Sequence, residues 1–177
     1  MGDTSATLAE QLREARASGQ RLRVCGARSK PWMSAASARW LNVSEHRGIV
    51  SYKPAELVVV VRAGTPLAEL DAALAEKQQM LAMEAPDFNG CSTIGGAVSL
   101  GWAGSRAAFT QGVRDSVLGV RMLNGQGELL RFGGEVMKNV AGFDVSRLMV
   151  GSGGRLGALL ELSLKVLPRP AAEITLA

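Results

Sequence analysis

A run of small and hydroxyl-bearing residues, Cys91–Gly104, contains the residue types that most readily surround an anion. Hydroxyl groups precede the glycines in Thr93–Gly96, and Ala97–Leu100 suits the first turns of a helix. No carboxylate occurs in residues 88–114. A helix N-terminus with free N–H groups, nearby hydroxyls and no competing negative charge favours phosphate or diphosphate. Glycines that only permit turns and tight helix packing explain the same stretch equally well.

A second candidate phosphate loop is the segment Gly26, Ala27, Arg28, Ser29 and Lys30. It follows a predicted strand, and its two cations and one hydroxyl can bind an anion, although a single glycine makes a poor backbone nest. A plain turn after a strand explains it as well. Neither loop matches GxGxxG or GxxxxGK[ST], the two common nucleotide signatures.

Other chemistries find little support in the sequence. Cys25 and Cys91 lie far apart without a CxxC partner, and His46 is the only histidine. This predicts no metal site and no Ser-His or Cys-His catalytic set. We assign no catalytic residue, and we expect His46 to be an ordinary surface residue.

Composition narrows the class of protein. The chain has 177 residues, 47% of them hydrophobic and 20% charged, with a net charge of +4. Arginines and lysines are interspersed with acidic residues and aromatic residues are few, which argues against a nucleic-acid partner. The longest aliphatic run, Leu57–Val61, is far too short for a transmembrane segment, so we expect a cytoplasmic protein. The unusual feature is 21 glycines, most of them between Gly90 and Gly157.

These loops need regular elements to position them. Spacing of apolar residues predicts a helix over 5–18, started by a capping box at Thr7 and Glu10, and a second helix from Thr65-Pro66 to about Gln79. A short helix is expected at Asp144–Met149. Alternating or β-branched runs predict strands at Arg21–Cys25, Trp40–Val43, Gly48–Tyr52, Leu57–Val61, Met80–Met83, Val117–Leu123, Glu128–Phe132 and Ala158–Leu167.

Early strands alternate with helices and later strands pair in hairpins, which predicts an α+β fold of two lobes. The expected N-terminal α/β lobe covers about residues 1–54. The larger lobe covers about 55–171, with a mainly antiparallel sheet flanked by helices.

Taken in order, these pieces resemble the FAD-binding domain of the vanillyl-alcohol oxidase/PCMH flavoprotein superfamily, and most closely the GlcE-type subunits of glycolate oxidase. The resemblance covers about residues 20–170. The motifs that carry it are Gly48–Val59, Arg62–Leu70, Thr93–Gly96, Gly112–Gly119 and Arg131–Met149, of which Met137–Met149 is specific to this subunit type.

The resemblance implies a single two-lobed domain that holds FAD noncovalently between its lobes. Gly26–Lys30 would be one diphosphate contact and Thr93, Ile94, Gly95 and Gly96 the other. Three residues would line the flavin side: Gly101, Gly104 and Arg106. Three more would follow the ribose and adenine: Gly112, Asp115 and Val117.

Departures from the family pattern accompany the matches. The first loop has Ala27-Arg28 where the family usually has glycines. Side chains at these positions can obstruct the approach of the backbone to a diphosphate. The alternative is that Arg28 itself supplies positive charge to the phosphates. Ser105 replaces a usual Pro, and Ala107 a common second Arg. No histidine lies in the first loop for a covalent flavin link, and the chain stops soon after Pro170, without the substrate or cap region of relatives.

By this resemblance the chain is an oxidoreductase subunit, inactive alone, in a complex that oxidises a 2-hydroxy acid. Its partners would be a second flavoprotein subunit and an iron–sulfur subunit, with attachment to the inner membrane through partners left open. Two alternatives remain at this point. One is a flavin-free structural or regulatory subunit that keeps the fold, and the other is a fragment of a D-lactate or D-2-hydroxyglutarate dehydrogenase.

Overall fold

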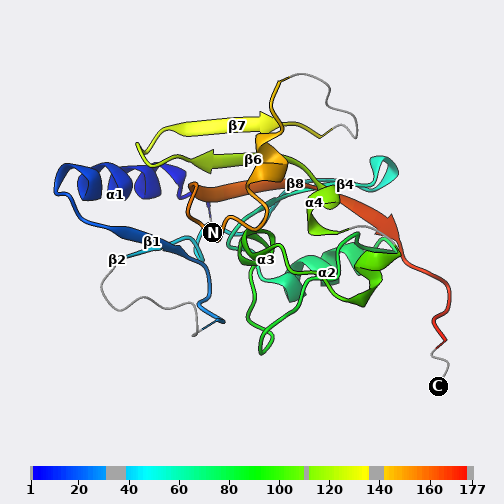
Figure 1. The fold of residues 1–177 in the computed structure, drawn as a ribbon. Helices are drawn as coiled ribbons and strands as arrows, with labels where there is room; N and C mark the ends of the chain where they lie inside the picture. The colour runs from blue at the N-terminus through cyan, green and yellow to red at the C-terminus, as the bar shows by residue number, and fades with distance from the viewer. Residues whose placement is uncertain (1, 31–38, 110–111, 136–141, 175–177) are drawn as a thin grey trace.

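A computed structural model describes residues 2–30, 39–109, 112–135 and 142–174 of the chain (Figure 1). Its elements in chain order are α1 (Ser5–Ala17), β1 (Leu22–Cys25), β2 (Arg39–Asn42), β3 (Ile49–Lys53), η2 (Pro54–Glu56), β4 (Val58–Arg62), α2 (Leu67–Ala75), β5 (Gln79–Leu81), α3 (Ile94–Leu100), η3 (Ser105–Ala108), α4 (Val113–Ser116), β6 (Val117–Leu123), β7 (Leu129–Gly133), α5 (Val145–Leu148) and β8 (Ala158–Pro168).

The larger sheet has six strands, which pair in the order β3-β4-β8-β6-β7, with β5 added to the far end of β8. Every pairing in it is antiparallel. The central position of β4 in this sheet explains its run of β-branched residues, because Val58–Val61 is buried along its whole length. The predicted hairpin is confirmed as β6 and β7, joined by the turn at Asn124–Gly127.

Helices α2 and α3 cover one face of this sheet, and Figure 1 shows them below its strands. The stripe Leu67, Leu70 and Leu74 of α2 packs in one core with Ile94 and Val98 of α3 and with the inward side chains of the strands. This core fixes where α3 begins relative to the end of β4.

A smaller sheet consists of β1 and β2, which pair in parallel with Arg23 opposite Trp40. Helix α1 packs over it, and a second core joins Leu8 of α1 and Leu41 of β2 to Leu123 and Leu160 of the large sheet. The predicted α+β class with a mainly antiparallel sheet is confirmed.

The division into lobes near residue 54 stays a prediction. The structure does show that Ile49–Lys53, on the N-terminal side of that boundary, pairs with β4 of the large sheet. The short helix expected at Asp144–Met149 is present as α5, capped by the Asp144 carboxylate, whereas residues 136–141 of the motif before it lie outside the described residues. Each helix in the described part of the chain is too short or too polar to span a lipid bilayer.

The capping box predicted at Thr7 and Glu10 is wrong. Helix α1 begins at Ser5, so Thr7 lies inside its first turn. Asp3 takes over the start of the helix, since its Oδ1 accepts a hydrogen bond of 2.8 Å from the Ser5 N–H. Hydrogen bonds from Ser5 and the charge of Arg121 hold the pKa of Asp3 at about 2.

The second predicted helix was misplaced at both ends. Helix α2 begins at Leu67 after Pro66 and ends at Ala75, not near Gln79. Thr65 is not its cap, because the Thr65 hydroxyl is turned toward the neighbouring chain and accepts a hydrogen bond of 2.8 Å from the Gly48 N–H. Gln79 belongs to β5 instead, because it pairs with the end of β8.

His46 is not a surface residue, contrary to expectation. Its side chain is fully buried, and its Nδ1 accepts a hydrogen bond of 3.0 Å from the Thr4 N–H. The ring therefore carries its proton on Nε2, which has no hydrogen-bond partner among the described residues. Burial lowers the pKa of His46, an effect that Arg62 and Arg121 strengthen and that Asp3 and Glu161 oppose.

The buried histidine predicts a pH dependence of stability. Because its pKa is lowered in the folded state, the unfolded chain takes up the proton first, so this contribution to stability is complete above the ordinary value of 6.5 and declines as the pH falls below it. In His46→Gln we expect a shallower fall in melting temperature between about pH 7 and pH 5 than in the wild type. Parallel curves for the two proteins would contradict this role of His46.

Candidate functional site

A cavity of about 440 Å³ lies where the β1–β2 pair meets the large sheet and α3. One wall is the continuous segment 23–30, the second half of β1 with the loop after it. The facing wall includes Thr93, Gly95, Gly96 and Ser99 of α3 and its cap. Both predicted phosphate loops therefore line the same cavity, although they are far apart in the sequence.

The two loops touch because a glycine removes the obstacle between them. A Cβ added to Gly26 would lie 2.5 Å from Thr93 Oγ1. Below this contact, Ser29 Oγ lies 3.3 Å from Ser92 Oγ, and the Lys30 ammonium donates to Ser29 Oγ at 3.1 Å. The first loop is thus fixed against the start of α3 by close packing and hydroxyl contacts.

The start of α3 does not offer the free N–H groups that the sequence suggested. The Thr93 hydroxyl accepts from the Gly96 N–H, while the N–H groups of Ile94 and Gly95 donate to the carbonyls of Thr65 and Ala63. The expectation of unpaired backbone donors at the start of α3 is wrong, since the end of β4 and the cap already use them, whereas the phosphate contact of Thr93–Gly96 stays a prediction.

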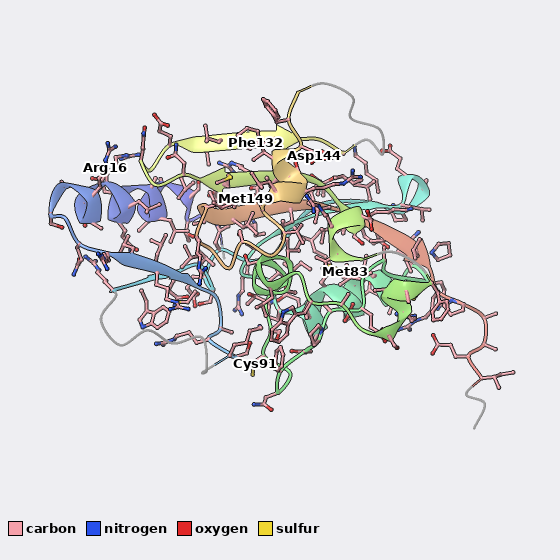
Figure 2. The ribbon with its side chains drawn as sticks, in the orientation of Figure 1. Arg16, Met83, Cys91, Phe132, Asp144 and Met149 are labelled. Atoms are coloured by element: carbon pink, nitrogen blue, oxygen red, sulfur yellow. The ribbon has the colours of Figure 1, made fainter. Side chains whose placement is uncertain are left out.

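A carboxylate lies close to the start of α3, although residues 88–114 contain no Asp or Glu. Asp87 Oδ1 accepts a hydrogen bond of 2.8 Å from the Ser92 N–H. The exposed Cys91 lies one residue earlier, at the tip of the loop before α3 (Figure 2).

The first loop offers more unpaired backbone donors than the start of α3 does. No described residue accepts a hydrogen bond from the N–H groups of Ala27, Arg28 or Ser29. Arg28 adopts a left-handed conformation with φ of +53°, so the loop takes a shape usually reserved for glycine despite its side chains. This reverses the ranking that glycine content alone suggested.

The cavity is lined by positive charge. Arg23, Arg28 and Lys30 contribute to its walls, and none of its described lining residues is acidic. Burial lowers the pKa of Lys30, while the nearby Asp87 carboxylate opposes that shift. The Lys30 ammonium also lies 4.9 Å from the centre of the Phe88 ring. An anion entering the cavity would meet these cations without displacing a carboxylate from its walls.

Close packing decides the role of Gly95. A Cβ there would lie 2.6 Å from Ala63 Cβ and 2.7 Å from the Ala63 carbonyl oxygen, so the residue lets α3 abut the end of β4. Gly96 is different, because an added Cβ would lie 3.1 Å from Thr93 Oγ1 and 3.8 Å from Lys30 Nζ. Both glycines line the cavity, but the Cβ position of Gly95 points at Ala63, whereas Ile94 is buried in the core and does not line the cavity.

The residues predicted on the flavin side do not line this cavity. Gly101 ends α3 with φ of +68° against Gly151, and a Cβ on Gly104 would overlap the Glu84 carboxylate. Arg106 lines a separate cavity of about 270 Å³, where it lies 3.9 Å from a Glu84 oxygen and 3.7 Å from a Glu173 oxygen.

The residues predicted along the ribose and adenine also lie elsewhere. Gly112 precedes α4, Asp115 is exposed on that helix, and Val117 is buried at the start of β6. None of the three lines the cavity. Their predicted contacts stay predictions, and the structure does not bring them together with the two loops.

Other lining residues were missed by sequence reasoning. They include Arg23, Trp40, Ser99, Gly153 and Gly154. The last two belong to the glycine excess that extends to Gly157, which was a usable signal. Trp40 had none, since a single aromatic residue in a short strand is normally a core residue.

The described residues hold no group of three or more His, Cys, Asp or Glu that could bind a metal ion. No histidine, tyrosine or carboxylate lines the cavity among them, and the titratable side chains of its described walls are those of Arg23, Cys25, Arg28 and Lys30.

Comparison with known proteins decides the family. Residues 2–133 match the family model described as "FAD binding domain". The chain belongs to this family. The predicted resemblance is thereby confirmed, and FAD is confirmed as the cofactor to which the fold is adapted.

The curated relatives show which proteins of this family the chain resembles. The chain is 50% identical over 175 residues to glycolate oxidase subunit GlcE of Escherichia coli (strain K12), which covers 98% of this chain and 50% of that protein. It is 40% identical over 85 residues to glycolate oxidase subunit GlcD of Bacillus subtilis (strain 168), covering 48% of this chain and 18% of the relative. D-lactate dehydrogenase of Anaerostipes hadrus is 34% identical over 136 residues, covering 77% of this chain and 28% of the relative. The chain thus spans half the length of its GlcE relative, and less of the others.

Solved structures share the fold. An alkyldihydroxyacetonephosphate synthase superposes with a TM-score of 0.77 at 19% identity, covering 93% of this chain and 30% of that one. Phl p 4.0202, a glucose dehydrogenase, gives 0.78 at 17% identity, covering 96% of this chain and 34% of that one. At such identities the comparison supports the architecture alone.

The different surroundings of the two adjacent glycines predict different costs of substitution. Gly95→Ala should destabilise the fold by about 1–3 kcal/mol, because the new methyl group overlaps Ala63 and its carbonyl. Gly96→Ala should cost clearly less, since only the Thr93 hydroxyl must give way by a few tenths of an ångström. Urea denaturation of both variants measures this, and equal losses would show that α3 does not pack on β4 as described.

Proposed function

We propose that this chain is the FAD-binding part of a GlcE-type glycolate oxidase subunit and that it binds FAD noncovalently in the cavity between β1–β2 and α3. The observation that carries the proposal is the meeting of two sequence-distant loops around a cavity with cationic and no acidic described walls. The 50% identity to GlcE of Escherichia coli supports the choice of subunit type.

The cavity walls suit the two parts of such a ligand. Ser29 and Lys30 offer a hydroxyl and an ammonium to a diphosphate, with the backbone donors of Ala27 and Arg28 beside them. Apolar side chains of Val24, Val43, Leu100 and Leu159 line the same cavity and suit an aromatic ring system. Gly96 keeps the space between these groups open.

Bound flavin would supply a two-electron acceptor for the hydride released when a 2-hydroxy acid becomes a 2-oxo acid. This chain's own residues would bind and orient that group and exclude water from its diphosphate. Groups that orient the substrate would come from elsewhere in the complex, because the described cavity walls hold no histidine, tyrosine or carboxylate. We therefore assign no catalytic residue and expect no turnover by the chain alone.

The proposed partners are a second flavoprotein subunit and an iron–sulfur subunit of a cytoplasmic complex that acts on a small 2-hydroxy acid, with no nucleic acid involved. The likeness to both GlcE and GlcD of glycolate oxidase supports a complex of several subunits. Attachment to the inner membrane would come through those partners.

A second candidate function is a flavin-free structural or regulatory subunit with the same fold. The side chains of Ala27 and Arg28 in the first loop, and the engaged N–H groups of Ile94, Gly95 and Gly96, favour it. A fragment of a D-lactate or D-2-hydroxyglutarate dehydrogenase is less well supported, because identity falls from 50% with GlcE to 34% with the D-lactate dehydrogenase.

Flavin quantitation separates the two candidates. The purified full chain should carry FAD or take it up stoichiometrically from solution, and heat denaturation should release the flavin unmodified, as expected of a noncovalent cofactor. A folded, colourless protein that fails to bind added FAD would refute the proposal and favour the flavin-free subunit.

Gly96 provides the test of location. Gly96→Leu should lower FAD affinity by about tenfold or more, since the side chain would enter the cavity toward Lys30. Gly125→Leu is the matched control, because Gly125 is exposed in the β6–β7 turn with nothing within 4 Å of an added Cβ. If Gly96→Leu remains folded with unchanged flavin content, the cofactor lies elsewhere.

A further inference from the structure

Trp40 lies close to two arginines in the lining of the cavity, and the sequence alone indicated no role for it. The Cζ atom of Arg23 is 5.9 Å from the centre of its ring, and that of Arg28 is 6.0 Å away. Arg23 is its direct neighbour across the parallel β1–β2 pair, whereas Arg28 comes from the loop after β1. All three side chains line the cavity.

This arrangement gathers positive charge without compensation. Neither Arg23 nor Arg28 forms an ion pair with a described residue, and residues 31–38, between that loop and β2, contain no Asp or Glu. Lys30 adds a third cation to the same walls. Like charges held together in this way repel one another, so an anionic ligand gains from each of them.

The aromatic ring restricts where these cations can lie. A guanidinium near an indole face is attracted by the negative charge of the ring face. A free arginine side chain would lose rotational freedom on binding an anion, and contact with Trp40 removes part of that loss beforehand. Such a residue increases affinity without touching the ligand.

We propose that Trp40 is a positioning residue that holds the Arg28 guanidinium at the wall of the cavity, where it binds the diphosphate of the nucleotide. This inference rests on the proposed function. It assigns the contact with the diphosphate to the Arg28 side chain, because the N–H groups at the start of α3 are already hydrogen-bonded within the protein. Guanidinium groups pair well with phosphate because they donate two parallel hydrogen bonds.

A double-mutant cycle tests this. The full chain, freed of nucleotide, is titrated with FAD and separately with inorganic pyrophosphate, for wild type, Arg28→Gln, Trp40→Leu and the double variant. We expect Arg28→Gln to weaken both ligands by about 5- to 10-fold at low salt, and Trp40→Leu by about 3-fold. The double variant should bind no more than about twofold weaker than Arg28→Gln, because Trp40 acts through Arg28.

Two further variants make the result specific. Trp40→Phe should retain most of the affinity, since a ring still faces the guanidinium, and it also guards against loss of folding in Trp40→Leu. Arg39→Gln removes an exposed arginine of the same strand that does not line the cavity, and should leave both affinities unchanged. Added salt should weaken binding to the wild type more than binding to Arg28→Gln.

The outcomes separate the inference from the proposed function. If the wild type binds FAD but Arg28→Gln and Trp40→Leu bind FAD and pyrophosphate as tightly as it does, the inference is wrong and the proposed function stands. Losses that multiply in the double variant would also overturn it, because Trp40 would then act independently of Arg28. A wild type that binds neither ligand would overturn both.

Discussion

The close approach of α3 to the end of β4 is the constraint on which the site depends. At Gly95 the helix lies so near Ala63 that no Cβ fits, and the N–H groups of Ile94 and Gly95 donate to carbonyls at the end of that strand. This contact sets Thr93 in place, and Thr93 in turn leaves just enough room for Gly26 of the first loop. Two segments separated by more than sixty residues are thereby joined around one cavity.

The same constraint changes how an anion can be held. Backbone donors at the start of α3 stabilise the fold, so they are not free to bind a ligand. In the proposed function, binding falls instead to the first loop, where the left-handed Arg28 adds a cation to the cavity lining and the N–H groups of Ala27, Arg28 and Ser29 have no described acceptor. The side chains of Lys30 and of the arginines near Trp40 would then supply the positive potential that a glycine-rich loop supplies through its backbone N–H groups.

The sequence predicts the fold well and the site less evenly. Strong β-branched runs such as Val58–Val61 and the alternation of β8 identify strands directly, because their burial patterns are local. Helix ends were less predictable, since Thr7 and Thr65 have suitable hydroxyls whose partners are decided by tertiary contacts. The burial of His46 was likewise invisible, because it depends on where the N-terminal segment docks. The spacing of glycines predicted both loops, but it could not predict that the N–H groups at the start of α3 are hydrogen-bonded within the protein. No feature of the sequence indicated a role for Trp40.

The central claim is that one cavity, enclosed by the first loop and the start of α3, binds FAD. Hydrogen–deuterium exchange of the full chain with and without saturating FAD measures this most directly. We predict that the N–H groups of residues 26–30, which have no hydrogen-bond acceptor among the described residues, gain the largest protection, with a smaller gain in α3. Protection confined to other parts of the chain, with residues 26–30 unchanged by bound FAD, would contradict it.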